Sequence, residues 1–387
     1  MKLILSVEAL SIQLTGIGRY AWELTSGLPR VLPDDEIRYH HQQRWVQNPE
    51  RLLHEPVEQA LTTVDSQQPI KKKPWGLRRI SKWLAKSKRL NRPNWRTQCE
   101  GAVFHGPNFF VPDYADKAVI TIHDLSIFKF PETHPKERIL QFERNFKRSL
   151  SKASHIITDS EATRHELISH AGLREQDVTA IPLAASAHYR PRTAIAVQEH
   201  LSRHGLNYQG YTLSVSTLEP RKKIDALLTA YRLLPVNLRQ NIPLVLVGGK
   251  GWLSDALHHE IDKAAAEGWL KYLGFIPESE LPLLYAGARS FAYPSIYEGF
   301  GLPVLEAMAS GIPVVTSNRT SLPEVTQGMA LHVEPDNSDA FKEALQKSLE
   351  DNIWRTAIIP KALDVAGRYS WDLCIRETVA VYRKVDA

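Results

Sequence analysis

Short apolar strands alternate with amphipathic helical patterns along most of this chain, and this alternation limits its possible folds more than any other feature. In the first half, the apolar runs at residues 2–9, 117–124 and 154–160 each end in polar or turn residues. A cleaner second series of strand and helix patterns begins at residue 211. Successive strand–helix units pack as a mostly parallel sheet with helices on both faces, so the sequence predicts an α/β protein with doubly wound sheets.

The strand pattern is lost between residues 186 and 210, which indicates a boundary between two domains. A length of 387 residues is sufficient for two domains of ordinary size. We therefore expect one Rossmann-like domain at residues 1–195 and a second at residues 205–370, facing each other across a cleft.

Particular residues mark the ends of some helices. Ser160 is a good N-cap for the helical pattern that follows it, and Gly172 is a good stop for the same pattern. Residues 15–19 (TGIGR) read as a glycine turn, after which an amphipathic stretch is expected to run from Tyr20 to Leu28.

The composition is that of a folded soluble protein, with 43% hydrophobic and 24% charged residues. No apolar run approaches the roughly 18–20 residues of a membrane-spanning helix. The N-terminus lacks the features of a signal peptide and reads as a first strand. With only Cys99 and Cys374, neither a disulfide framework nor a zinc site is expected, which favours the reducing cytoplasm.

The net charge of +5 is placed unevenly. Residues 66–98 contain eleven Lys and Arg residues and no Asp or Glu, so the remainder of the chain is net acidic. Leu77, Ile80 and Leu84 share one helical face there, with tryptophans beside it. This pattern is typical of a helix on an anionic membrane surface, and we expect residues 71–96 to make that contact. A solvated arm is the alternative.

In open α/β sheets the ligand lies at the carboxyl ends of the strands, so residues directly after strands are the candidates for a site. One group of them lies in the stretch from Pro294 to Val315. A helix that opens at Leu302 offers backbone N–H groups to a phosphate, and Gly299 and Gly301 permit close approach. Glu306, one turn into the helix, can accept hydrogen bonds from ribose hydroxyls, and Glu298 can bind a sugar.

The stretch YPSIYEGFGLPVLEAMASGIPVVTSN resembles the E-x7-E signature of the retaining glycosyltransferases of family four, which have the two-domain GT-B fold. The resemblance covers nearly the whole chain apart from about residues 35–100. It includes the segments TGIGRYAWEL, FHGPNFFVP, ITIHDLS, TDSEAT, VSTLEPRKK, LVGGKGW and YSWDLCIRETVAVYR. The TLEPRKK segment is similar to mannosyltransferases of bacterial lipopolysaccharide O-antigen assembly, which use GDP-mannose.

The resemblance implies roles for individual residues. Arg221 and Lys222 are similar to the cations that hold the donor diphosphate, although many members have an arginine at the position of Thr217, and Lys223 is an alternative contact. His123 matches a histidine near the sugar C6 hydroxyl and the reaction centre. With Glu298, these form the expected catalytic set: His123, Arg221, Lys222 and Glu298. The expected nucleotide-sugar-binding residues are Gly16, Gly18, Ile276, Gly299, Phe300, Gly301, Leu302 and Glu306.

The implied activity is retaining transfer by front-face attack, in which the donor phosphate takes the acceptor proton. The expected donor is GDP-mannose, with GDP-rhamnose or a UDP-sugar as alternatives, and the expected acceptor is a lipid-linked glycan. No metal and no cofactor are expected, because no D-x-D pair follows a strand. The protein is expected to lie at the inner face of the cytoplasmic membrane, with residues 371–387 as a helix that packs back on the first domain.

Other functions leave different signatures. A GT-B epimerase would need another pattern of acid–base carboxylates, and a phosphorylase would need a cofactor lysine; the sequence has neither signature. Nucleic-acid binding is suggested only by the cations and tryptophans of residues 71–96. The acidic remainder of the chain and the lack of a recognised binding motif argue against it.

Overall fold

The computed structural model describes the chain except for residues 13, 15, 56–93, 134–135, 250 and 252–254. The predicted membrane-binding segment is residues 71–96, and its residues 71–93 therefore lie outside the described residues. The chain divides into two compact units. The first comprises Met1–Thr121, Arg148–His155 and Val379–Ala387, and the second comprises Ile122–Lys147 and Ile156–Thr378.

The first sheet has seven strands in the order β3-β2-β1-β4-β5-β6-β7. The described pairings are parallel except for that of β2 with β3, which is antiparallel. Its strands are β1 (Lys2–Ser6), β2 (Glu36–His41), β3 (Arg44–Val46), β4 (Ala102–Gly106), β5 (Lys117–Ile122), β6 (His155–Thr158) and β7 (Val178–Ala180).

The second sheet has six strands in the order β10-β9-β8-β11-β12-β13, with parallel pairings. Its strands are β8 (Thr212–Val215), β9 (Leu244–Val247), β10 (Leu270–Tyr272), β11 (Ser290–Tyr293), β12 (Val314–Ser317) and β13 (Leu331–Val333). The strand order reverses between β8 and β11: the chain proceeds outward from β8 to β10, then returns to start again beside β8. Such a switch point is where doubly wound sheets bind ligands.

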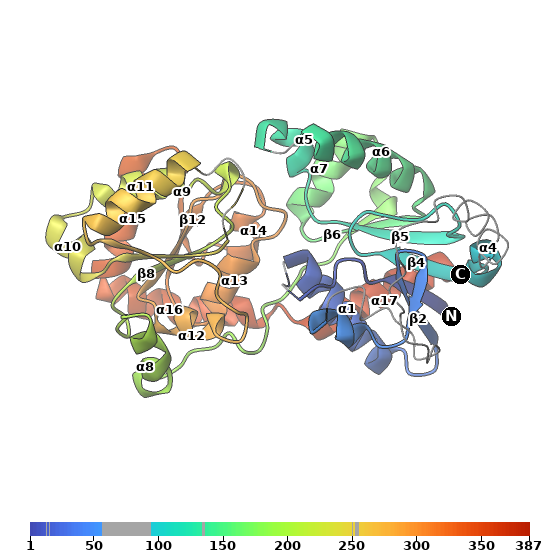
Figure 1. Ribbon diagram of the computed structural model, residues 1–387, viewed down its shortest axis with the longest axis horizontal. Helices are drawn as coiled ribbons and strands as arrows, with labels where there is room; N and C mark the ends of the chain where they lie inside the picture. Colours follow the sequence, from blue (N-terminus) through green and yellow to red (C-terminus); the bar gives the residue numbers. More distant parts are fainter. Residues whose placement is uncertain (13, 15, 56–93, 134–135, 250, 252–254) are drawn as a thin grey trace, which may run out of the picture. The chain divides into compact units, whose positions relative to one another are not determined.

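The helices follow the strands in both halves of the sequence (Figure 1). In the first half they are α1 (Gly16–Val31), α4 (Trp95–Cys99), α5 (Ser126–Lys129), α6 (Lys136–Lys152) and α7 (Glu161–Ala171). In the second half they are α8 (Ala194–Arg203), α9 (Ile224–Arg232), α10 (Val236–Asn241), α11 (Asp255–Ala266), α12 (Leu281–Gly287), α13 (Leu302–Ala309), α14 (Leu322–Thr326), α15 (Ser338–Glu350), α16 (Asn352–Gly367) and α17 (Trp371–Asp386).

The predicted ends of α7 are confirmed, whereas the predicted start of α1 is wrong. The Ser160 hydroxyl accepts a hydrogen bond from the Thr163 N–H, and Gly172 closes the helix in a left-handed conformation at φ 64°. Helix α1 begins at Gly16 and not at Tyr20, so both glycines of the predicted turn are helical. Gly18 is buried in this helix, and burial outweighs the low helix propensity of glycine.

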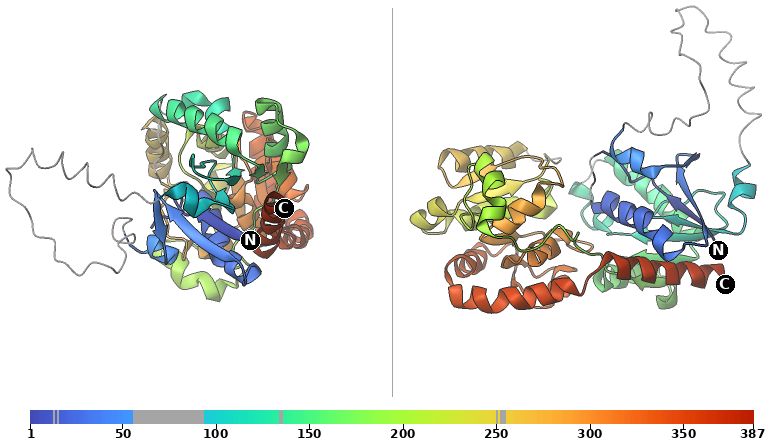
Figure 2. Two further views of the ribbon diagram at one scale, coloured as in Figure 1. Left: turned by 90° about the vertical axis from the view of Figure 1, so that its right-hand side faces the viewer. Right: turned by 90° about the horizontal axis from the view of Figure 1, so that it is seen from below.

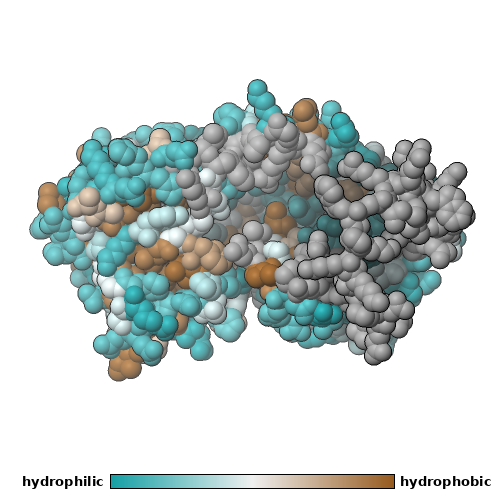
Figure 3. All heavy atoms as spheres, viewed as in Figure 1, coloured by the Kyte–Doolittle hydropathy of each residue, from teal (hydrophilic) through white to brown (hydrophobic). Residues whose placement is uncertain are grey.

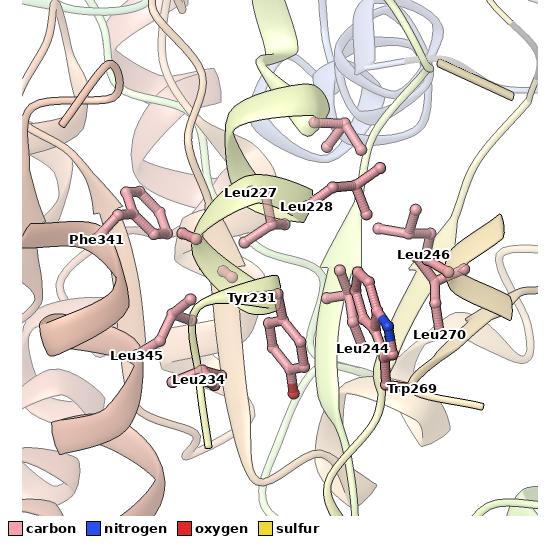
Figure 4. Close-up of a cluster of buried hydrophobic side chains, with 14 of the residues drawn as sticks. Leu227, Leu228, Tyr231, Leu234, Leu244, Leu246, Trp269, Leu270, Phe341 and Leu345 are labelled. Carbon is pink, nitrogen blue, oxygen red and sulfur yellow. The ribbon is translucent and has the colours of Figure 1, made fainter. Parts of the chain in front are cut away.

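One face of the second sheet is covered by α9, α11 and α15, and the apolar core beneath them is drawn in Figure 4. Tyr231 of α9 stacks on Trp269, with ring centroids 5.9 Å apart. Phe341 of α15 and Leu246 of β9 belong to the same buried cluster. The helical period of the apolar residues in α9 and α15 directs them onto the sheet, and their burial stabilises this layer.

The last turns of α17 belong to the first unit, and Figure 2 shows both chain termini near each other there. The hydroxyl of Tyr382 lies 2.5 Å from Nδ1 of His105 in β4. Lys117 at the start of β5 pairs with the carboxylate of Asp386 at 3.1 Å.

The surface in the view of Figure 3 is mostly hydrophilic over the described residues, with smaller apolar areas. Among the described residues, no helix is both long enough and apolar enough to cross a membrane.

Two isoleucines on helices of the second unit allow a matched test of this core. Ile261 of α11 is 1% exposed and belongs to the buried cluster, whereas Ile353 of α16 is 86% exposed. We expect Ile261→Ala to lower the free energy of unfolding by about 2–5 kcal/mol, because it leaves a cavity in the core. The control Ile353→Ala should change it by less than about 0.5 kcal/mol. Urea unfolding measures both, and equal effects would contradict the described core.

Candidate active site

The loops after β8 and β11 meet at the switch point of the second sheet. The first loop carries Arg221 and Lys222, and the second carries Glu298. Their backbones are joined directly, because the N–H of Ile296 donates to the carbonyl of Arg221 at 3.0 Å. The Ser295 hydroxyl donates to the same carbonyl at 3.3 Å. Strand order thus brings together side chains that are more than 70 residues apart in the sequence.

Lys222 and Glu298 form a buried ion pair, with Nζ 2.5 Å from Oε1. The hydroxyl of Tyr293, the last residue of β11, donates to the same carboxylate oxygen at 2.8 Å and accepts from Lys222 Nζ at 3.0 Å. Lys222 is 8% exposed and Glu298 is 9% exposed. The three groups therefore hold one another in a fixed arrangement with little access to water.

Arg221 adds a second cation to this pair. Its Nη1 lies 3.6 Å from Oε2 of Glu298 and donates to the carbonyl of Tyr297 at 3.0 Å. Its Nε donates to Glu219 at 3.1 Å. Lys223, the remaining candidate of the sequence analysis, pairs instead with Asp336 at 2.6 Å.

The electrostatics of the cluster favour an ionised Glu298. Burial alone would raise the pKa of Glu298, but Lys222 and Arg221 outweigh burial and lower it to about 2. Burial opposes the charged form of Arg221, but Glu298 and the carboxylates of Asp124 and Glu219 outweigh it and raise the pKa of Arg221. Burial and the adjacent Arg221 lower the pKa of Lys222, while Glu298 acts in the opposite direction.

The Glu298 loop is also held from the side of β12. The N–H of Glu298 donates to the hydroxyl of Thr320 at 3.0 Å. The hydroxyl of Ser321 donates to the carbonyls of Glu298 and Phe300, at 2.9 and 2.8 Å. These bonds fix the backbone on both sides of Gly299, so the carboxylate does not depend on the ion pair alone for its position.

Helix α13 starts directly after this loop, and its first turn carries no side-chain cap. Gly301 adopts a φ of 109°, which favours glycine, and Pro303 lies in the first turn, where it has no N–H to leave unpaired. Uncapped N–H groups and the helix dipole make such a terminus suitable for an anion.

Glu306 lies in the same helix and is 7% exposed. Burial first, and then Glu306, raise the pKa of Tyr285 well above its usual range, which places the Glu306 carboxylate beside that phenol.

His123 follows β5, and its Nδ1 lies 2.7 Å from the buried carboxylate of Asp159. Burial raises the pKa of Asp159, and His123 opposes that shift. A carboxylate on Nδ1 fixes this nitrogen as the donor and leaves Nε2 as the acceptor of a neutral ring.

The backbone of His123 also approaches the glycine loop within the second unit. A Cβ on Gly299 would lie 1.7 Å from the His123 carbonyl oxygen, so only glycine fits there. The Ser160 hydroxyl donates to the Gly299 carbonyl at 2.6 Å. Both contacts lie within one compact unit.

The structure therefore brings together Arg221, Lys222 and Glu298, and joins the backbone of His123 to the same loop. Gly16 and Gly18 belong to the first unit, and their predicted contact with the donor stays a prediction. Ile276 is 9% exposed after β10, and its predicted contact with a base stays a prediction.

Four polar groups of the site were not predicted from the sequence, namely Tyr293, Asp159, Thr320 and Ser321. Tyr293 and Asp159 stand at or directly after the ends of strands β11 and β6, so the rule that ligands bind at carboxyl ends of strands could have identified them. The others carry no such signal.

Comparison with known proteins gives the chain a family. Residues 198–364 match the family described as "Glycosyl transferases group 1". The chain is 38% identical to the O-antigen chain mannosyltransferase B of Escherichia coli in an alignment of 387 residues, which covers 99% of this chain and 100% of the relative. It is 30% identical to the serotype-specific mannosyltransferase WbdA of Escherichia coli in an alignment of 281 residues, which covers 69% of this chain and 34% of that protein.

Solved structures show the same fold at lower identity. The crystal structure of Anabaena Alr3699/HepE in complex with UDP and glucose is similar, with a TM-score of 0.72 at 18% identity, over 99% of this chain and 100% of that chain. The structure of WaaG, a glycosyltransferase involved in lipopolysaccharide biosynthesis, has a TM-score of 0.69 at 16% identity, over 98% and 99% of the two chains.

The ion pair predicts how stability depends on pH. The pKa of Glu298 falls from an ordinary 4.5 to about 2 in the folded protein, so its ionised form stabilises the fold above about pH 4.5. This contribution, about 3 kcal/mol, is lost as the pH falls toward 2. We expect Glu298→Gln to unfold at lower urea than the parent at pH 7, and the gap to narrow from pH 5 to pH 3.

Glu343→Gln, at an exposed glutamate of α15, is the control and should follow the parent at each pH. A gap for Glu298→Gln that stays constant over this range would contradict the assigned shift.

Proposed function

The chain belongs to the group 1 glycosyltransferases and has the GT-B fold, and from this premise we propose that it transfers mannose from GDP-mannose to a glycan acceptor in O-antigen assembly. The observation that carries the proposal is the buried cluster of Arg221, Lys222 and Glu298 at the switch point, beside the uncapped start of α13. The name of a relative that matches 99% of this chain supports mannose as the sugar.

Donor binding follows from this geometry. The diphosphate would lie at the start of α13, where backbone N–H groups and the two cations offer complementary charge. Glu306 would accept hydrogen bonds from the ribose hydroxyls. Glu298 would keep Lys222 in place and accept hydrogen bonds from the mannose hydroxyls.

The same cations would act in the chemical step. As the bond between the sugar and the phosphate breaks, negative charge grows on the terminal phosphate of the departing GDP. Arg221 and Lys222 are held by their carboxylate partners before the reaction and need little reorganisation to stabilise that charge. Two fixed cations supply this stabilisation without a metal ion. The acceptor hydroxyl would attack from the face of the leaving phosphate, with retention of configuration, and pass its proton to a phosphate oxygen.

His123 would orient the transferred sugar. Asp159 fixes Nδ1 as the donor, so Nε2 can accept a hydrogen bond from the sugar C6 hydroxyl.

The acceptor is proposed to be a lipid-linked glycan at the inner face of the cytoplasmic membrane, which the protein would contact through the basic segment 71–96. That part of the proposal rests on the sequence pattern, and flotation with anionic and neutral liposomes tests it.

Thermal shifts with GDP-mannose, GDP-rhamnose, UDP-glucose and ADP-glucose test the donor. We expect GDP-mannose to raise the melting temperature most, because a ligand at 100 times its dissociation constant stabilises by about 2.7 kcal/mol. Glu306→Ala should lose most of this shift through the lost ribose contacts. Glu343→Ala, on the exposed face of α15, should keep it.

A shift with a UDP-sugar and none with GDP-mannose would overturn the proposed donor and leave the transferase class intact. A full shift for Glu306→Ala would overturn the ribose assignment.

A comparison of variants at the adjacent Lys222 and Lys223 distinguishes a specific role in catalysis from the general effect of losing one positive charge. We expect Lys222→Met to slow GDP release from saturating GDP-mannose by about 10²–10³-fold, the usual effect of removing one preorganised group that stabilises developing charge. Lys223→Met removes the same charge one residue away, at the pair with Asp336, and should change the rate only a few-fold. Equal losses in the two variants would contradict the assignment of Lys222.

A further inference from the structure

A second polar cluster of the second unit lies where α8 packs against α12. It consists of His200, His204 and Glu280, each of which offers one ligand atom, and these atoms lie within 4.8 Å of one another. His200 belongs to α8, His204 is the C-cap residue of that helix, and Glu280 is the N-cap residue of α12. The two histidines are four residues apart, so they share one face of the helix.

The imidazole of His200 is buried, at 3% exposure, without hydrogen bonds to its ring nitrogens from the described residues. Buried polar atoms in folded proteins are nearly all satisfied, so a buried imidazole with two unbonded nitrogens requires an explanation. A bound metal ion would account for one of the two nitrogens, because it takes the lone pair of that nitrogen.

The distance between two of the groups fits a shared metal ion better than a hydrogen bond. Nδ1 of His200 lies 3.5 Å from Oε2 of Glu280, and the contact is not a hydrogen bond. Ligands about 2.1 Å from a tetrahedral metal ion lie about 3.4 Å from each other. His204 stands beside His200, with ring centroids 5.0 Å apart.

The surroundings permit a cation. The Glu280 side chain is 38% exposed, which leaves one side of the cluster open to water and to an entering ion. Nearby cations have other partners: Arg203 lies 3.8 Å from Glu199, and Lys271 donates to the carbonyl of Gly205.

We propose that His200, His204 and Glu280 bind a divalent transition-metal ion, with Zn²⁺ as the fitting case and water as the fourth ligand. Two imidazoles and one carboxylate suit zinc, cobalt, nickel or copper, whereas magnesium and calcium prefer oxygen ligands. The ion would join α8 to the start of α12. This site is separate from the proposed catalytic cluster, and its test does not depend on the donor.

Binding is measured with the full chain free of any histidine tag, after treatment with a chelator and dialysis. Isothermal titration with zinc chloride should show one site, and Co²⁺ should give the visible absorption of a tetrahedral complex. Zinc should also raise the melting temperature. The substitutions are made at the partly exposed His204 and Glu280, because truncation of the buried His200 could unfold the protein.

We expect His204→Ala and Glu280→Gln each to weaken zinc binding by at least about tenfold, since even outer-shell partners of metal ligands contribute that much. His259→Ala, at an exposed histidine of α11, should bind like the parent. No stoichiometric zinc binding by the parent would overturn the proposal, as would unchanged affinity in both ligand variants or equal weakening by His259→Ala.

Discussion

The buried pair of Lys222 and Glu298 is the interaction on which the arrangement of the switch point depends. An isolated charge in this position would be costly, and removal of either partner leaves the other uncompensated. The pair is tolerable because Tyr293 donates a hydrogen bond to the same carboxylate oxygen, and the Arg221 cation lies 3.6 Å from the other oxygen. In consequence the loops after β8 and β11 are held together, and α13 starts at a defined place beside two cations.

The same arrangement connects stability with function. A cluster in which two cations meet two carboxylates, Glu219 and Glu298, is nearly balanced in charge before any ligand is present. A diphosphate at the start of α13 would compete with these carboxylates for the cations. The cations that bind the donor and stabilise the leaving group would therefore be the same ones that form the ion pairs. Preorganised charge of this kind is what stabilises a leaving group in a site with little water.

Much of the fold was predictable because its signals are local. The alternation of strand and helix patterns predicted doubly wound sheets, and the N-cap Ser160 and the glycine stop Gly172 marked the ends of α7 correctly. The start of α1 was wrong by four residues, because the burial of Gly18 outweighed the local preference of glycine for a turn. Local preference is a weak guide wherever tertiary packing acts against it.

The sequence by itself determined the fold class, the candidate residues after the strands and the Glu298–Glu306 stretch, because periodicity, capping and spacing act over a few residues. Only the tertiary structure decided which charges become partners. It paired Glu298 with Lys222 and left Lys223 to Asp336, and it placed Asp159 on His123. It also brought His200 and Glu280 together from two helices. These pairings depend on strand order and helix packing, which are set by contacts between residues far apart in the sequence.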